Sequence, residues 1–421
     1  MKENKPLHIF QAYGVELEYM IVDKNTLSIK PIADELIRVA SGSYVDEFEN
    51  GSVTWSNELV RHLIELKCTR PTADLWQLGQ DFAANVRQIN HLLSAFDAKL
   101  MPTAAHPWMN PMEETQLWPY GNKEIYETYD RIFNCKGHGW ANLQSTHINL
   151  PFANDEEFAR LHAAIRILMP IMPSLTASSP ILDGQFSGFL DKRLDYYRRN
   201  QERIPQICGR VIPEQAFSEA DYQRMIYDPI TTAKAPHDPE GILEAVWLNS
   251  RGAIARFDRG SVEIRILDIQ ESPLADLALL NLIIYVLRLL ADEKLCSMAV
   301  QQQQPEGKLA AILFQVARQA EGTLVDDEAY LSLLQWHNGP VEAAQLWHHL
   351  YQRALAAYPV ALAPWKTTIE HILQSGSLSS RILRHCDGIY SRENLKLVYS
   401  ELCDCLQEND TFETWQPAVS S

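Results

Sequence analysis

The chain has 421 residues, of which 46% are hydrophobic and 22% are charged, and its formal net charge at pH 7 is -17. This length and composition are ordinary for a globular protein with a sizeable core. The acidic balance argues against a general nucleic-acid binder, which needs a basic face.

The cysteines and the apolar segments indicate where such a protein works. Seven cysteines are scattered along the chain without a Cys-x-x-Cys pair, which predicts reduced thiols rather than a disulfide framework. Residues 1–10 lack the apolar core of a signal peptide. The most apolar run, residues 277–287, is too short to span a bilayer and predicts a buried helix. We therefore expect a cytoplasmic protein with no membrane partner.

The stretch of residues 13–23 is rich in Val, Ile and Tyr and predicts a β-strand. Side chains alternate between the two faces of a strand, so Glu16 and Glu18 share one face, about 7 Å apart. Two carboxylates this close repel each other unless a proton or a cation lies between them. This strand alone leaves two readings open, a solvated face and a site for a divalent cation such as Mg²⁺, which takes oxygen ligands.

The rest of the chain mixes helices, strands and long loops. Helices are marked by apolar residues at helical spacing, polar caps and prolines, and strands by alternation with a period of two. The expected elements are a helix over 32–40, an acidic turn over 45–52, a strand over 62–67, a helix from Thr72 or Asp74 to about 96, a loop over 101–121, a short helix over 126–131, a turn at 137–139, a strand over 141–151, a helix from Asn154 or Asp155 to about 170, a loop-rich stretch over 174–199, a lid or connection over 204–240, a strand over 259–268 and a helix from Pro273 to about 290. Beyond a low-complexity joint at 301–304 the chain is predicted to be mainly helical to about residue 408.

Four of the expected strands share one pattern. Each is apolar on one face and carries acids, a histidine or an arginine on the other. The polar members are Glu16 and Glu18, Glu65, His147 and Asn149, and Glu263 and Arg265. An antiparallel or mixed sheet with helices on its apolar face satisfies this pattern. Carboxylates repeated on one inward face destabilise a protein unless a cation holds them, which favours a metal site over a solvated face.

Several common motifs are missing from the sequence. There is no Gly-x-x-x-x-Gly-Lys-Ser/Thr loop and no Gly-x-Gly-x-x-Gly fingerprint, so neither a P-loop nor a Rossmann nucleotide site is supported. Zinc-type Cys/His spacing and the Gly-x-Ser-x-Gly nucleophile elbow are also missing.

Five motifs occur in an order that resembles the glutamate–cysteine ligase family, with the nearest likeness to its bacterial carboxylate–amine ligase branch. They are Gly14-Val-Glu-Leu-Glu-Tyr19, Glu65 in Ile-Glu-Leu, Ser145-Thr-His-Ile-Asn149, Thr176-Ala-Ser-Ser-Pro180 and Gly260-Ser-Val-Glu-Ile-Arg-Ile-Leu-Asp268. The resemblance covers about residues 10 to 292.

This resemblance implies an α+β fold similar to the catalytic domain of glutamine synthetase. A curved antiparallel sheet would form a half-barrel with helices on its outer face. ATP and Mg²⁺ or Mn²⁺ ions would sit on the concave face. Residues 1–300 would form this catalytic domain, and residues 301–421 a helical region packed on it.

The resemblance also implies roles for individual residues. Glu16, Glu18, Glu58, Glu65, His147 and Glu263 match positions that look like the family's metal ligands, and His147 could instead act through hydrogen bonds. Arg265 and Glu65 match catalytic positions. Arg265, Arg193, Arg131 and Asn149 are the candidates for contacts with substrate or nucleotide. For Arg193 and Arg131, ordinary surface ion pairs are the alternative.

The implied activity is an ATP-dependent ligation of a carboxylate to an amine. Transfer of the ATP γ-phosphoryl group would form an acyl phosphate that the amine attacks, with clustered cations neutralising the two anions. The expected partners are glutamate with cysteine or another small amine, and a homo-oligomer is compatible with the sequence. A metal-dependent amide hydrolase and a non-catalytic nucleotide-binding relative are the alternatives.

Two departures from the family pattern bear on the substrate. The first strand has Glu-Leu-Glu where many relatives have three consecutive acids, and the histidine strand has His-Ile-Asn where many have His-Val-His. The second departure replaces a potential ligand with the amide of Asn149, which would change the number of metals or the amine acceptor.

Overall fold

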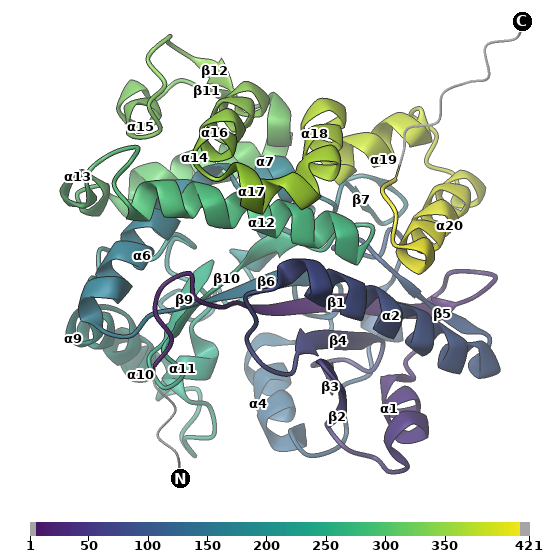
Figure 1. Cartoon of the computed structure of the whole chain (residues 1–421). Coiled ribbons are helices and arrows are strands. Elements are labelled where there is room, and N and C mark those ends of the chain that lie inside the picture. Colours follow the sequence, from purple (N-terminus) through teal and green to yellow (C-terminus); the bar gives the residue numbers. More distant parts are fainter. Residues whose placement is uncertain (1–5, 413–421) are drawn as a thin grey trace, which may run out of the picture.

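The computed structural model describes residues 6–412. Residues 1–5, where no signal peptide is expected, and residues 413–421 lie outside the described part. An antiparallel sheet of eight strands organises the fold (Figure 1). The strand order is β2-β3-β4-β1-β6-β10-β9, and β5 pairs with β1 beside this path. The strands are β1 (Gly14–Asp23), β2 (Glu47–Asn50), β3 (Val53–Asn57), β4 (Leu63–Cys68), β5 (Ala98–Met101), β6 (Ser145–Pro151), β9 (Ala253–Arg256) and β10 (Ser261–Asp268). Because β2 and β9 end the path unpaired with each other, the sheet is not closed into a barrel.

The four long strands predicted from alternation are all present, and they form neighbouring positions of the sheet as β4, β1, β6 and β10. Their apolar faces lie in the core: Val15, Leu17 and Tyr19 of β1 are fully buried. The same core cluster contains Phe82 of α2 (Leu75–Leu93) and Leu279 of α12 (Pro273–Ala291). One face of the sheet is therefore sealed by helices, as predicted.

The long helices begin where the sequence signals place them. Asp74 caps α2 by accepting a hydrogen bond from the Gln77 amide, and Asn154 caps α6 (Asp155–Leu168) in the same way. Ser272 caps α12, whose first residue is Pro273. The remaining longer helices of this part are α1 (Ala33–Ser41) and α4 (Lys123–Phe133).

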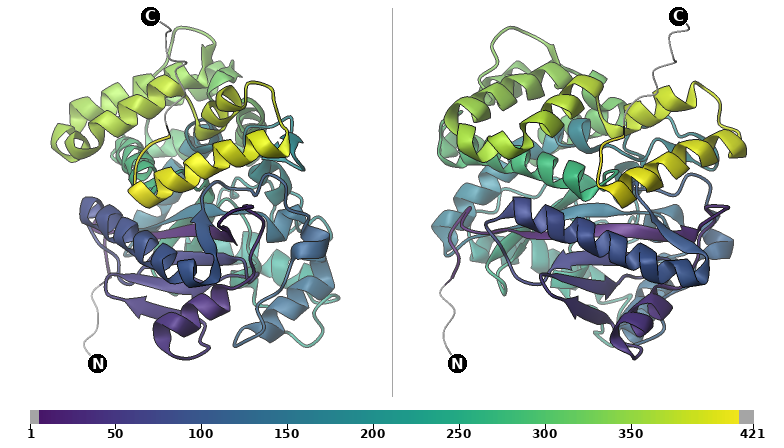
Figure 2. Two further views of the ribbon diagram at one scale, coloured as in Figure 1. Left: turned by 90° about the vertical axis from the view of Figure 1, so that its right-hand side faces the viewer. Right: turned by 45° about the vertical axis from the view of Figure 1, so that its right-hand side comes forward.

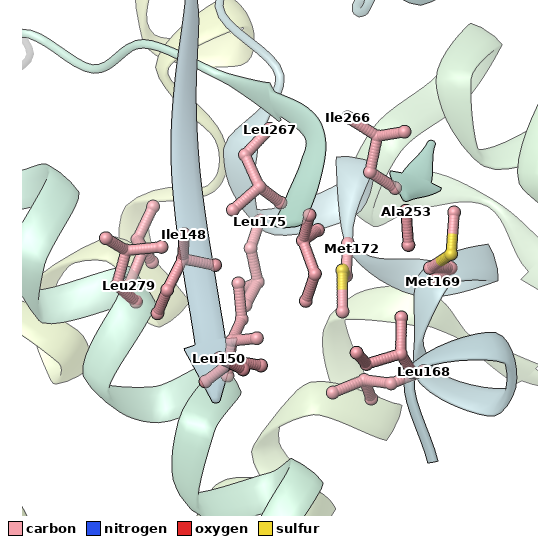
Figure 3. Close-up of a cluster of buried hydrophobic side chains, with 14 of the residues drawn as sticks. Ile148, Leu150, Leu168, Met169, Met172, Leu175, Ala253, Ile266, Leu267 and Leu279 are labelled. Atoms are coloured by element: carbon pink, nitrogen blue, oxygen red, sulfur yellow. The ribbon is translucent and has the colours of Figure 1, made fainter. Parts of the chain in front are cut away.

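A hydrophobic cluster joins the central strands to the helices behind them (Figure 3). It contains Ile148 and Leu150 of β6, Leu279 of α12, and Met172 and Leu175 from the segment that follows α6. All five side chains are at most 4% exposed. Burial of apolar surface stabilises a fold by about 25 cal/mol per Å², so this packing stabilises the attachment of the sheet to its helices.

The structure corrects the prediction for residues 45–52, which is not a turn throughout. Residues 47–50 form β2, which pairs with β3 at the end of the sheet. Two of its four residues, Glu47 and Glu49, are acidic and exposed, and Asn50 ends it, so the composition of this strand resembles that of a turn. The strands β3, β5 and β9 are likewise additional to the prediction, and each has only four or five residues. The predicted turn at 137–139 is the start of a single helical turn, α5 (His138–Ala141).

The apolar helix α12 is longer than the run that predicts it. It has 19 residues and is the one helix among residues 6–412 whose length and composition would suit a membrane span. Because 83% of its apolar window is buried inside the protein, α12 acts as a core helix.

Beyond residue 300 the chain is mainly helical, as predicted (Figure 2). The helices of nine or more residues in this part are α14 (Glu306–Gln319), α16 (Ala343–Ala357), α18 (Lys366–Ser375), α19 (Leu378–Cys386) and α20 (Arg392–Glu408). Leu395, Val398 and Leu402 of α20 share a buried cluster with Met20 of β1 and Met101 of β5. A division of the chain near residue 300 stays a prediction. All seven cysteines are free thiols.

Candidate functional site

The register of the sheet brings the predicted polar residues together. Glu16 of β1 lies opposite His147 of β6, and Glu18 lies opposite Glu65 of β4. Glu263 of β10 lies opposite Asn149. Residues directly opposite in antiparallel strands share a face. The polar side chains of four strands therefore converge on the face of the sheet away from α2 and α12.

His147 is at the centre of this group. Its Nδ1 is 3.0 Å from Oε2 of Glu16 and 3.9 Å from Oε1 of Glu263. Its Nε2 is 2.8 Å from Oγ of Ser145 and 3.8 Å from Oε1 of Glu18. Burial disfavours the charged imidazolium, but the hydrogen bond to Glu16 and the charges of Glu18 and Glu263 outweigh it and raise the pKa of His147.

Glu16 and Glu18 are each held by neighbouring polar groups. Asn149 donates a hydrogen bond of 3.0 Å to Glu16, and Ser145 donates two, from its amide and its hydroxyl, to Glu18. Burial favours the neutral carboxyl of Glu16, but hydrogen bonds from His147 and Glu65 and the charge of Arg265 lower its pKa to about 2. Glu16 is thus an anion fixed in one orientation.

The pKa values of Glu58 and Glu65 are shifted upward, in the opposite direction to that of Glu16. Burial and the charge of Glu18 raise the pKa of Glu58 to about 8. Burial and the charges of Glu16 and Glu58 raise the pKa of Glu65 well above its usual range. The Glu65 carboxylate is also within 2.5 Å of the Ser56 hydroxyl, which donates to it. More carboxylates are gathered here than can all be ionised without a cation.

Two sets of these side chains have the spacing of a metal site. Glu16, His147 and Glu263 each offer a ligand atom, and these atoms lie within 4.8 Å of one another. Glu18, Glu65 and His147 form a second set with the same property. His147 belongs to both, one ring nitrogen facing each set. A donor set of oxygens with one imidazole fits Mg²⁺ or Mn²⁺.

The predicted arginines have different surroundings. Arg265 donates from Nε and Nη2 to Glu263, at 3.0 and 2.5 Å. Arg193, in α8 (Lys192–Tyr197), is buried beside Asp268, and it lines a cavity that also contains the acids. Arg131 does not belong to the cavity wall among the described residues, and it donates to the carbonyl oxygen of His237 instead.

A cavity of about 1200 Å³ opens over this polar face. The predicted acids, His147, Asn149, Arg265 and Arg193 all line it. Its other walls carry aromatic residues that the sequence analysis does not single out, namely Tyr126, Tyr129, Trp140, Tyr197 and Trp247. Tyr126 and Tyr129 are three residues apart in α4, so they share one helix face. That spacing is the signal in the sequence that could identify this wall.

Comparison with known proteins shows which family this sequence matches. Residues 12–400 match the model of glutamate-cysteine ligase family 2 (GCS2). An Archaeoglobus fulgidus relative with the name "Uncharacterized protein" is 32% identical over 403 residues, which is 95% of this chain and 99% of the relative. A Rubrobacter xylanophilus protein named "Putative glutamate--cysteine ligase 2-3" is 26% identical over 176 residues, 41% of this chain and 44% of that protein.

Solved structures share the fold at low sequence identity. A bifunctional glutathione synthetase from Pasteurella multocida has a TM-score of 0.62 and 14% identity, over 95% of this chain and 53% of that chain. A glutamate–cysteine ligase from Francisella tularensis, in complex with AMP, has a TM-score of 0.55 and 13% identity, over 97% of this chain and 90% of that chain. This chain thus spans about half the length of the Pasteurella protein.

Proposed function

This chain belongs to glutamate-cysteine ligase family 2 and is a ligase, and from that premise we propose that it joins a carboxylate to an amine with consumption of ATP. The observation that carries the proposal is the convergence of Glu16, Glu18, Glu65, His147 and Glu263 on one wall of a single large cavity. Carboxylates gathered in this way with an imidazole suit the binding of divalent cations, which phosphoryl transfer from ATP requires.

The reaction would proceed through an acyl phosphate. Oxygen of the substrate carboxylate attacks the γ-phosphorus of ATP, ADP leaves, and the amine then displaces phosphate from the activated acyl carbon. Both first reactants are anions, so their approach requires positive charge. The two sets around His147 would hold Mg²⁺ or Mn²⁺, which would supply that charge when bound. Glu58 lines the same cavity.

The chain's own residues have separate tasks in this proposal. Arg265, fixed by Glu263, presents its guanidinium to phosphate oxygens. Asn149 and Ser145 orient Glu16 and Glu18. Burial and the neighbouring acids raise the pKa of Glu65, so a cation would compete with a proton for its carboxylate. The aromatic wall of Tyr126, Tyr129 and Trp140 excludes water that would hydrolyse the acyl phosphate.

Glutamate is the proposed carboxylate and cysteine or another small amine the proposed acceptor, on the strength of family membership. A half-barrel curvature of the sheet around the cavity belongs to the same proposal, and the cavity on its polar face supports it.

The test is a screen for ADP release across pairs of amino acids and amines, with Mg²⁺ and Mn²⁺ in parallel. We expect ADP in amounts equal to the amide formed, and only when carboxylate and amine are both present. Amide cleavage without nucleotide would favour the hydrolase alternative. Nucleotide binding without any ADP would favour a non-catalytic relative.

A further inference from the structure

Resting on the proposed ligation, we propose that Asp268 and Ser179 are positioning residues that fix the Arg193 guanidinium at the cavity wall. Arg193 would there be a permanent cation for the anionic oxygens of the carboxylate substrate. This arrangement joins two of the family-like motifs, Thr176–Pro180 and Gly260–Asp268. The residues that join them, Ser179 and Asp268, are not among the proposed metal ligands.

The contacts form a closed network. Arg193 donates from Nε to Oδ1 of Asp268 at 2.5 Å. Oδ2 of Asp268 accepts from the Ser178 amide and the Ser179 hydroxyl, both at 2.8 Å. The Ser179 hydroxyl oxygen in turn accepts from the Arg193 amide at 3.0 Å. These four residues are at most 2% exposed. A charge-assisted network satisfied at every step, and shielded from water, holds its members in one geometry.

An irregularity in β10 puts Asp268 where it can do this. The pairing of β10 with β6 shifts between Ile264 and Leu267, so one extra residue is inserted. By simple alternation Asp268 would share the apolar face with Ile264. After the shift it lies opposite Ser145 instead, on the polar face.

Arg193 is also held against β10. Its Nη2 donates to the backbone carbonyl of Arg265 at 3.2 Å, and its Nε is occupied by Asp268. It lines the cavity together with Tyr197 and Gln201, at four-residue intervals. Arg265 differs, because both of its hydrogen bonds to a carboxylate go to Glu263, within the acid group. The carboxylate partner of Arg193, Asp268, belongs to neither proposed metal set, whereas the partner of Arg265, Glu263, belongs to one.

The C-terminal helices support the same segment from outside. The amide of Asp191 donates to the carbonyl of Ala317 in α14, and the Asp191 side chain caps α8 at Leu194. Ser379 of α19 donates from its hydroxyl to the carbonyl of Leu190 at 2.5 Å and from its amide to that of Ala177. The residues that lead into α8, and with them Arg193 in its first turn, are thus held between the sheet and these helices.

The experiment measures binding of anions to the full chain without nucleotide, by calorimetric titration with L-glutamate, succinate and inorganic phosphate. Tighter binding of the two carboxylates than of phosphate identifies a substrate carboxylate as the ligand, and the reverse order would overturn that assignment. Arg193→Ala and Asp268→Asn should each weaken carboxylate binding by about tenfold or more, and Ser179→Ala by less. Ser174→Ala is the matched control, since Ser174 is equally buried nearby but bonds to Ile171.

Chemical rescue separates positioning from a merely structural role. Guanidinium ion added to Arg193→Ala should restore most of the carboxylate binding, because Asp268 still holds the added cation. In the double variant Arg193→Ala/Asp268→Asn, rescue should be lost. Equal rescue in both variants, unchanged binding in Asp268→Asn, or a wild-type chain that binds none of the anions would overturn the proposal. A failure of the proposed ligation would appear separately, as anion binding without ADP release.

Discussion

Glu18 and Glu65 stand directly opposite each other on β1 and β4, both at most 8% exposed. Like charges in this position destabilise a sheet. A cation between them would reverse that effect, so binding of Mg²⁺ or Mn²⁺ should stabilise the folded chain.

We expect either ion, at about a hundred times its dissociation constant, to raise the free energy of unfolding by about 2.7 kcal/mol. Thermal unfolding with and without the ion measures this. Glu18→Gln should remove most of the response, whereas Glu35→Gln, at an exposed pair with Arg38, should leave it unchanged. No shift in the wild-type chain at millimolar concentrations would contradict the metal assignment.

The contribution of Glu58 to the stability of the metal-free chain, measured as the difference in unfolding free energy between the wild type and Glu58→Gln, should fall as pH rises from about 5 to 8. The pKa of Glu58 is raised from 4.5 to about 8, so between these values the folded chain holds a proton that the unfolded chain has released. The loss should be on the order of 2 kcal/mol, because one pKa unit corresponds to about 1.4 kcal/mol and solvent screens this half-buried side chain. Urea unfolding in the presence of a chelator measures it.

The matched variant for this pH dependence is Glu58→Gln, which cannot ionise. Between pH 5 and pH 8 the wild-type chain should lose on the order of 2 kcal/mol of stability relative to this variant, because the buried histidines His62, His106 and His162 titrate alike in both chains. A profile as steep as the wild type's would show that another group causes the loss, with Glu65 as the first candidate, because its pKa is raised as well.

Glu65→Gln and Glu263→Gln should each reduce ADP release by about 100-fold or more, while the fold is retained. Glutamine keeps the shape of the side chain but removes the charge that a cation requires. Initial rates with saturating nucleotide measure the effect, and circular dichroism checks the fold. Normal turnover in both variants would mean that this face of the sheet is not the reaction site.

Arg381 and Glu271 form an ion pair that is 0% exposed on both sides and links α19 to the segment after β10. Glu271 also accepts from the amide of Phe412. Arg381→Met leaves Glu271 without its counter-charge and should cost about 3–5 kcal/mol of stability. Chemical unfolding measures this loss.

The control for this ion pair is Arg38→Met, at an exposed pair with Glu35, where the cost should be below about 1 kcal/mol. An equally small cost for Arg381→Met would show that the buried pair is not needed to hold α19.

Much of this fold can be predicted from the sequence because its central strands are long. Alternation over six or more residues identifies β1, β4, β6 and β10, and capping residues identify α2, α6 and α12. Four-residue strands such as β5 and β9 offer too few positions for a period to appear. The polar faces of the long strands are therefore predictable from the sequence, while the short strands are not.

The site itself is only partly predictable. Alternation places Glu18 and Glu65 on the polar faces of their strands. It does not reveal the strand register that sets the two residues opposite each other. The side chain of Asp268 would be placed on the apolar face by alternation, because the insertion in β10 leaves no composition signal. Arg131 lies in a helix that the sequence predicts, yet its side chain reaches the backbone of His237 rather than the cavity.

The support of the loop before α8 has a practical consequence. All the acids proposed as metal ligands precede residue 300, so a chain truncated there would keep every one of them. It would nevertheless lack Ala317 and Ser379, the outer anchors of that loop. We therefore expect a chain that ends at residue 300 to hold Arg193 less firmly than the full chain does.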